Sequence, residues 1–110
     1  MKKDINLMKE IPLTETAFLI LLTMIKPNHG YGVMQDVESL TKGRVVFGPG
    51  TLYGAINNLE KKGWIELDFH DKNNRKKIYK TTKVGREILF LELERMQNLL
   101  SASNSLLKGV

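Results

Sequence analysis

The sequence predicts a mostly helical α+β fold, in which short helices are followed by a two-stranded hairpin and then by one long C-terminal helix. Three observations support this prediction. Apolar residues recur at helical spacing in residues 14–25, 31–41 and 51–62. Residues 64–70 alternate in polarity and lead into a polar turn and a second strand-like stretch. Residues 82–107 then return to helical spacing over a longer stretch.

The chain of 110 residues is long enough for one domain with a modest core. Its hydrophobic content of 42% is ordinary for a globular protein, and its longest apolar run is too short to cross a bilayer. We expect neither a membrane partner nor a secretory signal. The chain has no cysteine, which excludes disulfides and thiolate metal ligands and fits a cytoplasmic protein.

The first two helices are predicted from their capping residues and apolar spacing. Thr14 can cap a helix that continues to about Ile25 and that Pro27 stops. His29-Gly30-Tyr31-Gly32 is expected to form a turn into the second helix, whose apolar stripe is Val33, Val37 and Leu40. Residues 1–12 show little period, and their role is not determined by the sequence.

The third helix is predicted between two glycine-marked ends. Gly48-Pro49-Gly50 indicates a turn, Thr51 is expected to cap the helix, and Gly63 to end it in the left-handed conformation. Its apolar face consists of Leu52, Ile56 and Leu59. Its opposite face offers donors, acceptors and a cation, from Tyr53, Gly54, Asn57, Asn58 and Lys61. A helix with these two faces is suited to the major groove of DNA.

A hairpin is predicted after this helix. Its first strand, from Trp64 to His70, would place Ile65, Leu67 and Phe69 on one face, and Asp68 and His70 together on the outer face. Residues 71–74 supply the turn, where asparagine tolerates positive φ, and the second strand runs over residues 75–81. Residues 45–47 are expected to add a short strand to this hairpin.

The positive charge of the chain is concentrated in the hairpin. The net charge is +5, and seven of the seventeen basic side chains lie between Lys72 and Arg86, with none of the twelve acidic ones. A local positive field of this kind is typical of a nucleic-acid interface. A basic run alone is more often a solvated turn, but its place directly after the third helix favours contact with DNA.

Helix, turn, helix and hairpin in this order form a winged helix-turn-helix, with the hairpin as its wing. Residues 14–88 resemble PadR-type transcriptional regulators. The resemblance lies in His29-Gly30-Tyr31-Gly32, Pro49-Gly50-Thr51-Leu52-Tyr53, Leu59-Glu60-Lys61-Lys62-Gly63 and Tyr79-Lys80-Thr81-Thr82-Lys83-Val84-Gly85-Arg86. Asn57 and Asn58 depart from the family pattern, where basic residues are common, and Thr81 replaces a usually apolar residue.

The resemblance implies a repressor that binds an inverted-repeat operator in double-stranded DNA as a homodimer and leaves it when a signal arrives. Thr51, Tyr53 and Asn57 would face bases or the adjoining backbone, and the basic residues would hold phosphates. For Tyr31, two roles are equally supported: packing as a half-buried side chain, and contact with the DNA backbone. The predicted DNA-binding residues are Tyr31, Thr51, Tyr53, Asn57, Asn58, Lys61, Lys62, Lys72, Arg75, Lys76 and Lys77.

The C-terminal helix is predicted to mediate dimerisation. Thr82 caps it, and it continues to about Leu107. A heptad seam for the partner consists of Leu89, Leu93, Met96, Leu100 and Leu107, and a second stripe toward the domain consists of Val84, Ile88 and Leu91. The chain therefore divides into residues 1–81, the N-terminal segment with the DNA-binding part, and residues 82–110, the dimerisation helix.

The resemblance also implies a small aromatic effector that binds between the C-terminal helices of the dimer. Phe90 and Met96 are the candidate residues that would contact it. We prefer the alternative that both fill the dimer core, because methionine and aromatic residues do so readily. His29 and His70 have no partner constellation, so we expect no enzyme, no metal and no cofactor. Two other functions stay open: a winged-helix adaptor for an acidic protein, and non-specific nucleic-acid binding.

Overall fold

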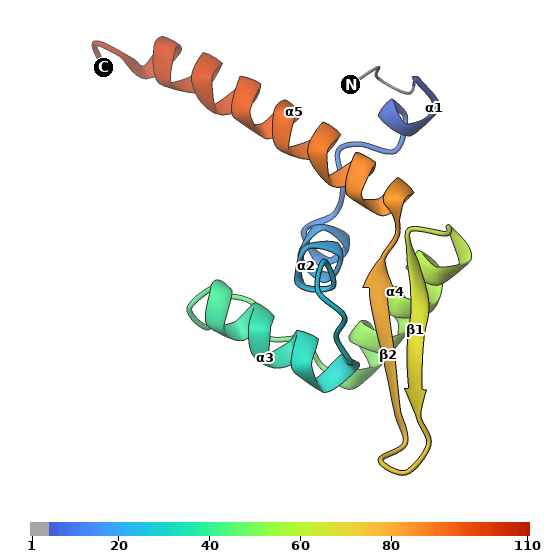
Figure 1. Cartoon of the computed structure of the whole chain (residues 1–110). Coiled ribbons are helices and arrows are strands. Elements are labelled where there is room, and N and C mark those ends of the chain that lie inside the picture. Colours follow the sequence, from blue (N-terminus) through green and yellow to red (C-terminus); the bar gives the residue numbers. More distant parts are fainter. Residues whose placement is uncertain (1–4) are drawn as a thin grey trace.

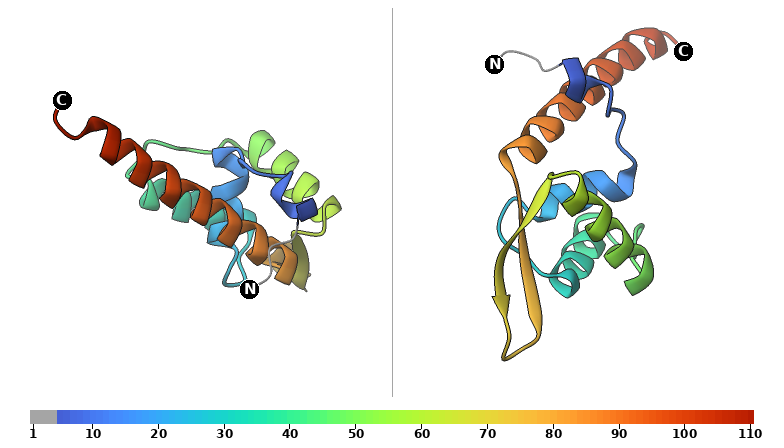
Figure 2. Two further views of the ribbon diagram at one scale, coloured as in Figure 1. Left: turned by 90° about the horizontal axis from the view of Figure 1, so that it is seen from above. Right: turned by 90° about the vertical axis from the view of Figure 1, so that its right-hand side faces the viewer.

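Residues 5–110 of the chain are described in the computed structural model of Figure 1. They form α1 (Ile5–Met8), α2 (Glu15–Thr23), α3 (Gly30–Leu40), α4 (Pro49–Lys61), β1 (Ile65–Asp71), β2 (Lys76–Thr81) and α5 (Lys83–Leu107). Helices α2, α3 and α4 form a body from which α5 extends as a rod and the β1–β2 hairpin projects as a wing (Figure 1 and Figure 2). The predicted mostly helical α+β class and winged helix-turn-helix fold are confirmed.

Helix α2 lies at the centre of the body and packs against α3, α4 and α5. Its Ile20 and Leu21 are fully buried, and so is Met24 at its C-cap. The surrounding elements cover them with Val33, Val37, Leu52, Ile56, Leu59, Trp64, Ile65 and Ile88, which are buried as well. Burying a side chain of this size contributes about 1.5–3 kcal/mol, so these apolar stripes hold the helices together.

The caps of α2 and α3 agree only partly with prediction. Thr14 caps α2 as expected, since its Oγ1 accepts a hydrogen bond of 3.1 Å from the N–H of Ala17. Helix α3 begins at Gly30, so most of the expected turn is helical. The stripe of α3 was predicted to include Leu40, and this is wrong: Leu40 is 55% exposed, because the helix ends there and the chain turns away through the left-handed Lys42 and Gly43.

The N-cap of α4 lies three residues earlier than predicted. Gly48 is its N-cap and Pro49 occupies its first turn, so the prediction that Thr51 caps this helix is wrong. Proline suits this position because its fixed φ is helical and its missing N–H is not needed there. The other end is confirmed: Gly63 has φ +75°, and the N–H of Trp64 donates to the carbonyl of Leu59 at 3.1 Å.

The sheet has two strands, and the expected third strand at residues 45–47 is absent. Phe47 enters the core instead. Asn28 pairs with the free edge of β2 instead, through two backbone hydrogen bonds of 2.8 and 2.9 Å with Tyr79. The link between α2 and α3 is therefore fastened to the wing.

Strand β1 contains an irregularity that the sequence pattern did not indicate. Leu67 pairs with Tyr79, but the next pair joins Phe69 to Ile78, which makes Asp68 the extra residue of a β-bulge. The prediction that Ile65, Leu67 and Phe69 lie on one face is therefore wrong, because the bulge moves Phe69 to the other face. Ile65 is buried, whereas Leu67 and Phe69 are exposed.

Helix α5 has the predicted length and cap. The Oγ1 of Thr82 accepts a hydrogen bond of 3.1 Å from the N–H of Gly85, and the helix continues to Leu107. Leu89 was assigned to the seam for a partner, but it is buried in the core of its own protomer beside Ile88. Val84, predicted to face the domain, is 40% exposed.

Candidate nucleic-acid interface

A cleft of about 450 Å³ lies between the start of α3, the exposed side of α4 and the wing. Helix α3 contributes Tyr31, and α4 contributes Tyr53 and Asn57. The wing contributes His70, Arg75, Lys76, Lys77 and Tyr79, and His29 precedes α3. The cleft thus brings together five of the predicted DNA-binding residues from α4 and the wing, and the exposed Tyr31.

The start of α3 and the middle of α4 are held together by a close contact. A Cβ atom at Gly30 would lie only 2.6 Å from the hydroxyl of Tyr53, so any larger residue would displace this ring. Gly30 therefore permits Tyr53 to lie against α3 while remaining 52% exposed. This contact fixes one wall of the cleft.

Not all predicted residues of α4 reach the cleft. Asn58 and Lys62 line a separate hollow with Glu10 and Trp64. The Nζ of Lys62 lies 3.4 Å from Oε2 of Glu10 and 4.7 Å from the centre of the Trp64 ring. Thr51 and Lys61 are exposed but do not line the cleft either.

The tip of the wing is built around Asp71. Its carboxylate accepts hydrogen bonds from the side chain of Asn74 and from the N–H groups of Asn73 and Asn74. The Asn74 side chain, first among these donors, holds the pKa of Asp71 below its usual range. The residue with positive φ in this turn is Arg75, at +53°, and not an asparagine as predicted.

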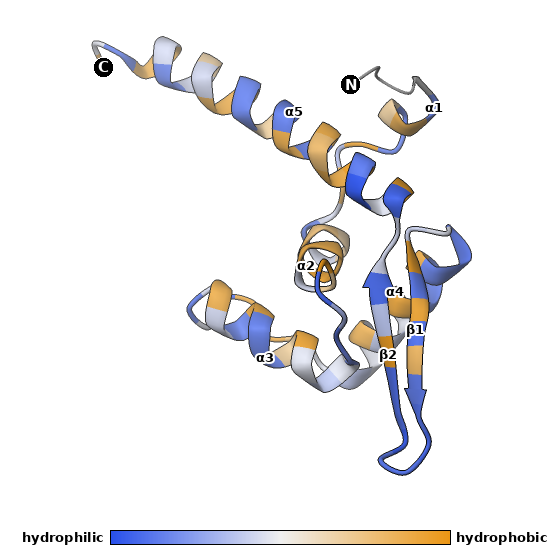
Figure 3. Ribbon diagram, viewed as in Figure 1, coloured by the Kyte–Doolittle hydropathy of each residue, from blue (hydrophilic) through white to orange (hydrophobic). Residues whose placement is uncertain are grey.

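The cations of the wing divide into two groups. Lys80 lies on the outer face, 3.3 Å from Oδ1 of Asp68 and 3.8 Å from Oε1 of Glu66. Among residues 5–110, no salt bridge joins Arg75, Lys76 or Lys77 to an acidic side chain. The tip of the wing is hydrophilic (Figure 3). Lys72 is exposed in its turn but does not line the cleft. The charges that line the cleft are therefore available to an anionic partner.

His29 and His70 are functional candidates that the sequence analysis set aside. Both line the cleft, although His70 was expected on the outer strand face with Asp68. That expectation is wrong because the bulge at Asp68 shifts the alternation of β1 by one residue. No signal in the sequence marks this bulge. Tyr79, by contrast, is almost fully buried at the back of the cleft, and this burial raises its pKa.

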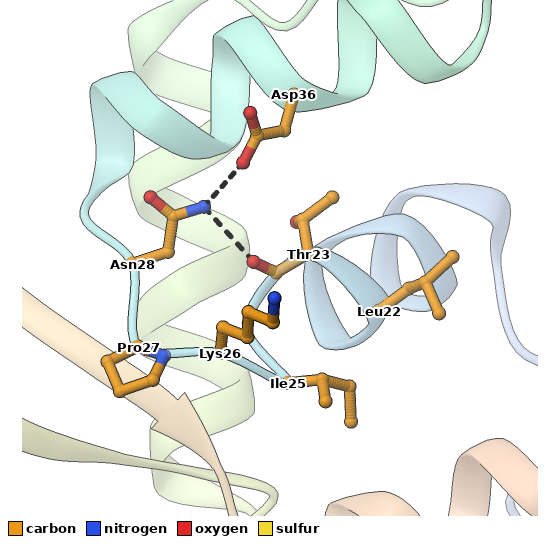
Figure 4. A pocket seen from close by; sticks show the side chains of 7 residues that line it. All are labelled: Leu22, Thr23, Ile25, Lys26, Pro27, Asn28 and Asp36. Carbon is orange, nitrogen blue, oxygen red and sulfur yellow. Dashed lines mark hydrogen bonds between the residues drawn. The ribbon is translucent and has the colours of Figure 1, made fainter.

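A second hollow, of about 490 Å³, lies between α2, the link 25–28 and α3 (Figure 4). The Nδ2 of Asn28 donates to the carbonyl of Thr23 at 3.0 Å and to Oδ2 of Asp36 at 2.9 Å. Asn28 thereby joins α2 to α3 by its side chain and both to β2 by its backbone. We assign this hollow a structural role, since its polar groups hold the cleft walls in place.

From Phe90 onward, α5 exposes large apolar side chains. Those that are at least 40% exposed are Phe90, Leu93, Leu99, Leu100, Leu106 and Leu107. Met96 is half-buried. An exposed apolar surface of this extent is characteristic of an interface. Residues 5–110 contain no helix with the length and apolar character needed to cross a membrane, and no group of three His, Asp or Glu suited to a metal ion.

Comparison with known proteins identifies the family. Residues 18–90 match the family model described as "Transcriptional regulator PadR-like family". The chain is a PadR-like protein. The resemblance seen in the sequence is thereby confirmed, and PadR-like proteins are transcriptional regulators rather than enzymes.

Two curated proteins whose names describe them as uncharacterized are similar to this chain. A 37.1 kDa protein in transposon TN4556 of Streptomyces fradiae is 34% identical over 73 residues, which cover 66% of this chain but 20% of that protein. This chain thus spans about a fifth of the length of that relative. A protein of Lysinibacillus sphaericus is 28% identical over 75 residues, covering 66% of this chain and 69% of that one.

Solved structures share the PadR-like fold. A transcriptional regulator from Clostridium thermocellum is similar with a TM-score of 0.70 at 22% identity, covering 86% of this chain and 93% of that one. A PadR family transcriptional regulator from Eggerthella lenta is similar with a TM-score of 0.70 at 23% identity, covering 86% and 82% of the two chains. This chain therefore shares its fold with these regulators. At 22% and 23% identity, the similarity is evidence for the fold alone.

Proposed function

We propose that this PadR-like protein is a cytoplasmic transcriptional repressor that binds an inverted-repeat operator as a homodimer. The observation that carries the proposal is the cleft in which Asn57 of α4 faces Arg75, Lys76 and Lys77 of the wing. An exposed polar helix face next to unpaired cations offers both base contacts and phosphate contacts. The wing tip would follow a phosphate strand or enter the minor groove, for which arginine is well suited.

The dimer part of the proposal rests on α5. Leu93 and Leu100 are exposed on it although both are large and apolar, and a second copy of the helix would cover them. A two-fold axis along this helix would present two α4 helices to two half-sites of a palindrome. Residues 82–110 are in this proposal the dimerisation part, and residues 1–81 the DNA-binding part.

Release by a small aromatic effector completes the proposal. Phe90, 58% exposed, and the half-buried Met96 lie on α5, where a flat ligand between the two helices would contact them. If they are only dimer core, their substitution changes dimer affinity and not the response to aromatic compounds. Calorimetric titration of wild type, Phe90→Ala and Met96→Ala with planar aromatic cations, together with sedimentation of each variant, separates these two roles.

The deciding experiment is a gel shift with the promoter DNA of the chain's own gene and random DNA as competitor. A repressor retains the promoter fragment at a competitor excess that removes non-specific binding. If the protein binds nucleic acid without specificity, random DNA displaces the promoter fragment in proportion to the mass of competitor added. A winged-helix adaptor shifts neither DNA, and its wing would bind an acidic protein instead.

A further inference from the structure

The bulge in β1 decides which side chains of the wing face the cleft. In an antiparallel ladder, directly opposed residues point to the same face of the sheet, and the faces alternate along each strand. Lys77 and Tyr79 of β2 both line the cleft. The residue opposite Lys77 is His70, and His70 lines the cleft as well.

Regular pairing would have produced a different cleft. If the ladder continued from the Leu67–Tyr79 pair without a slip, Phe69 would stand opposite Lys77, and His70 would lie on the outer face. Lys80 identifies that outer face, because it lies beside Asp68 and Glu66. The extra residue therefore moves Phe69 outward, where it is 56% exposed, and turns an imidazole inward.

The groups that face His70 across the cleft are polar or cationic. The wing contributes Arg75, Lys76 and Lys77, and the α3 side contributes His29 and Tyr31. Helix α4 contributes Tyr53 and Asn57.

The buried Tyr79 lies behind these groups. Glu60 of α4 acts electrostatically on Tyr79, but no carboxylate of the described residues lines the cleft. Such surroundings favour a polyanion at the mouth of the cleft.

We propose that His70 is a DNA contact of the wing, and that its imidazole takes up a proton when the duplex binds. This proposal rests on the proposed DNA-binding function. A DNA phosphate accepts a stronger hydrogen bond from an imidazolium than from a neutral ring, and it screens the three wing cations from the new charge. Histidine is the side chain whose charge changes near neutral pH, so binding to DNA becomes coupled to pH.

The test compares full-length wild type with His70→Gln and His29→Gln. Glutamine keeps a hydrogen-bond donor but cannot gain a charge near neutral pH. Dissociation constants for the promoter duplex and for a random duplex are measured by fluorescence anisotropy, between about pH 6 and about pH 8, at constant ionic strength. Circular dichroism across the same range verifies that each variant is folded.

For wild type, we expect the affinity for both duplexes to rise as the pH falls. His70→Gln should remove up to about one proton of this dependence per protomer and weaken binding roughly 3- to 10-fold at the acidic end, with little loss at the alkaline end. His29→Gln should leave the contribution of His70 in place. A third variant, deletion of Asp68, should remove the bulge while His70 still stands opposite Lys77, so it should keep the pH dependence of wild type.

Two results would overturn the proposal. One is a pH dependence and affinity of His70→Gln equal to those of wild type, which would make His70 a solvated wing residue. The other is loss of the pH dependence in His29→Gln alone. Both leave the DNA-binding function intact, whereas wild type that binds neither duplex at any pH refutes the proposed function itself.

Discussion

The backbone N–H of Leu13 donates a hydrogen bond of 2.8 Å to Oε2 of Glu92, which joins the segment before α2 to the middle of α5. Glu92 is only 2% exposed, although it is charged. Its other oxygen, Oε1, accepts a hydrogen bond from Nε of Arg95. The carboxylate is thus fully partnered, and it fixes the proposed dimerisation helix relative to the DNA-binding body.

The first prediction concerns the strength of this joint. Glu92→Leu should destabilise the protein by about 1–3 kcal/mol, because it leaves the part-buried N–H of Leu13 without a partner and Arg95 without its carboxylate. Urea unfolding followed by circular dichroism measures this change in the free energy of unfolding. Gln97→Ala, on the exposed side of the same helix, is the matched control and should stay within about 0.5 kcal/mol of wild type. Equal stability of wild type and Glu92→Leu would contradict the structural role.

The second prediction concerns the pH dependence of stability at Glu92. The hydrogen bond from Arg95, and then that from Leu13, hold the pKa of Glu92 below its ordinary value of 4.5, while burial opposes them. A carboxyl group with a lowered pKa in the folded state stabilises the fold above the unfolded value, and this contribution is lost as the pH falls through the folded pKa.

The difference in unfolding free energy between wild type and Glu92→Gln should therefore be largest at about pH 7 and shrink progressively as the pH falls below 4.5, through the lowered pKa of the folded state. Urea titrations at a series of pH values measure it. A difference that is the same at every pH would show that the charge of Glu92 contributes nothing.

The third prediction tests the α5 interface. Leu93→Arg combined with Leu100→Arg should abolish the dimer and operator binding, because each arginine would be buried without a partner in the seam. Both leucines are exposed in the protomer, at 43% and 55%, so the fold itself should be retained. Sedimentation velocity measures the mass. Ala102→Arg, on the opposite side of the helix, serves as the control and should remain dimeric. A doubly substituted protein that still sediments as a dimer would place the interface elsewhere.

The fourth prediction tests the cations of the wing. Arg75, Lys76 and Lys77 line the cleft and have no acidic salt-bridge partner among the described residues, so their replacement by alanine should weaken binding to specific and random DNA alike. The slope of log affinity against log salt should flatten by up to about three per wing if all three touch phosphate. Lys80→Ala, which removes a cation already paired with Asp68, should change this slope much less. An unchanged slope in the triple variant would mean that these cations are merely solvated.

The sequence allowed the order of elements to be predicted because each carries its own local signal. Thr14 and Thr82 cap their helices, Gly63 ends α4, and Leu52, Ile56 and Leu59 form its buried face, all of which depend on near neighbours. These local signals were enough for the fold and for the family resemblance.

What the sequence did not reveal depends on contacts between distant residues. The bulge at Asp68 arises from pairing with β2, and it decides that His70 and not Phe69 lines the cleft. Leu89 has the spacing of a dimer seam, but the packing of α5 on its own body buries it. Glu92 looks like any polar helix residue until the chain brings Leu13 to it, 79 residues away in sequence.

The last prediction concerns base recognition by Asn57. This side chain is exposed on α4 and lines the cleft, facing the wing. Asparagine can donate one hydrogen bond to N7 of adenine and accept another from the N6 amino group. Lysine cannot form this pair, because it has no acceptor. Asn57→Ala should therefore lose about 1–3 kcal/mol of binding free energy on the operator and little on random DNA.

Asn58 supplies the matched control for this prediction. It is the same residue type one position later, but it lines the hollow beside Lys62 and Trp64 and not the cleft. Asn58→Ala should therefore leave base preference unchanged. Selection of preferred sites from a randomised duplex pool, for wild type and both variants, measures this directly. For Asn57→Ala, the preference at one base pair per half-site should relax. If the preference is unchanged at every position, or if binding to operator and random DNA falls equally, Asn57 contacts phosphate or water rather than a base.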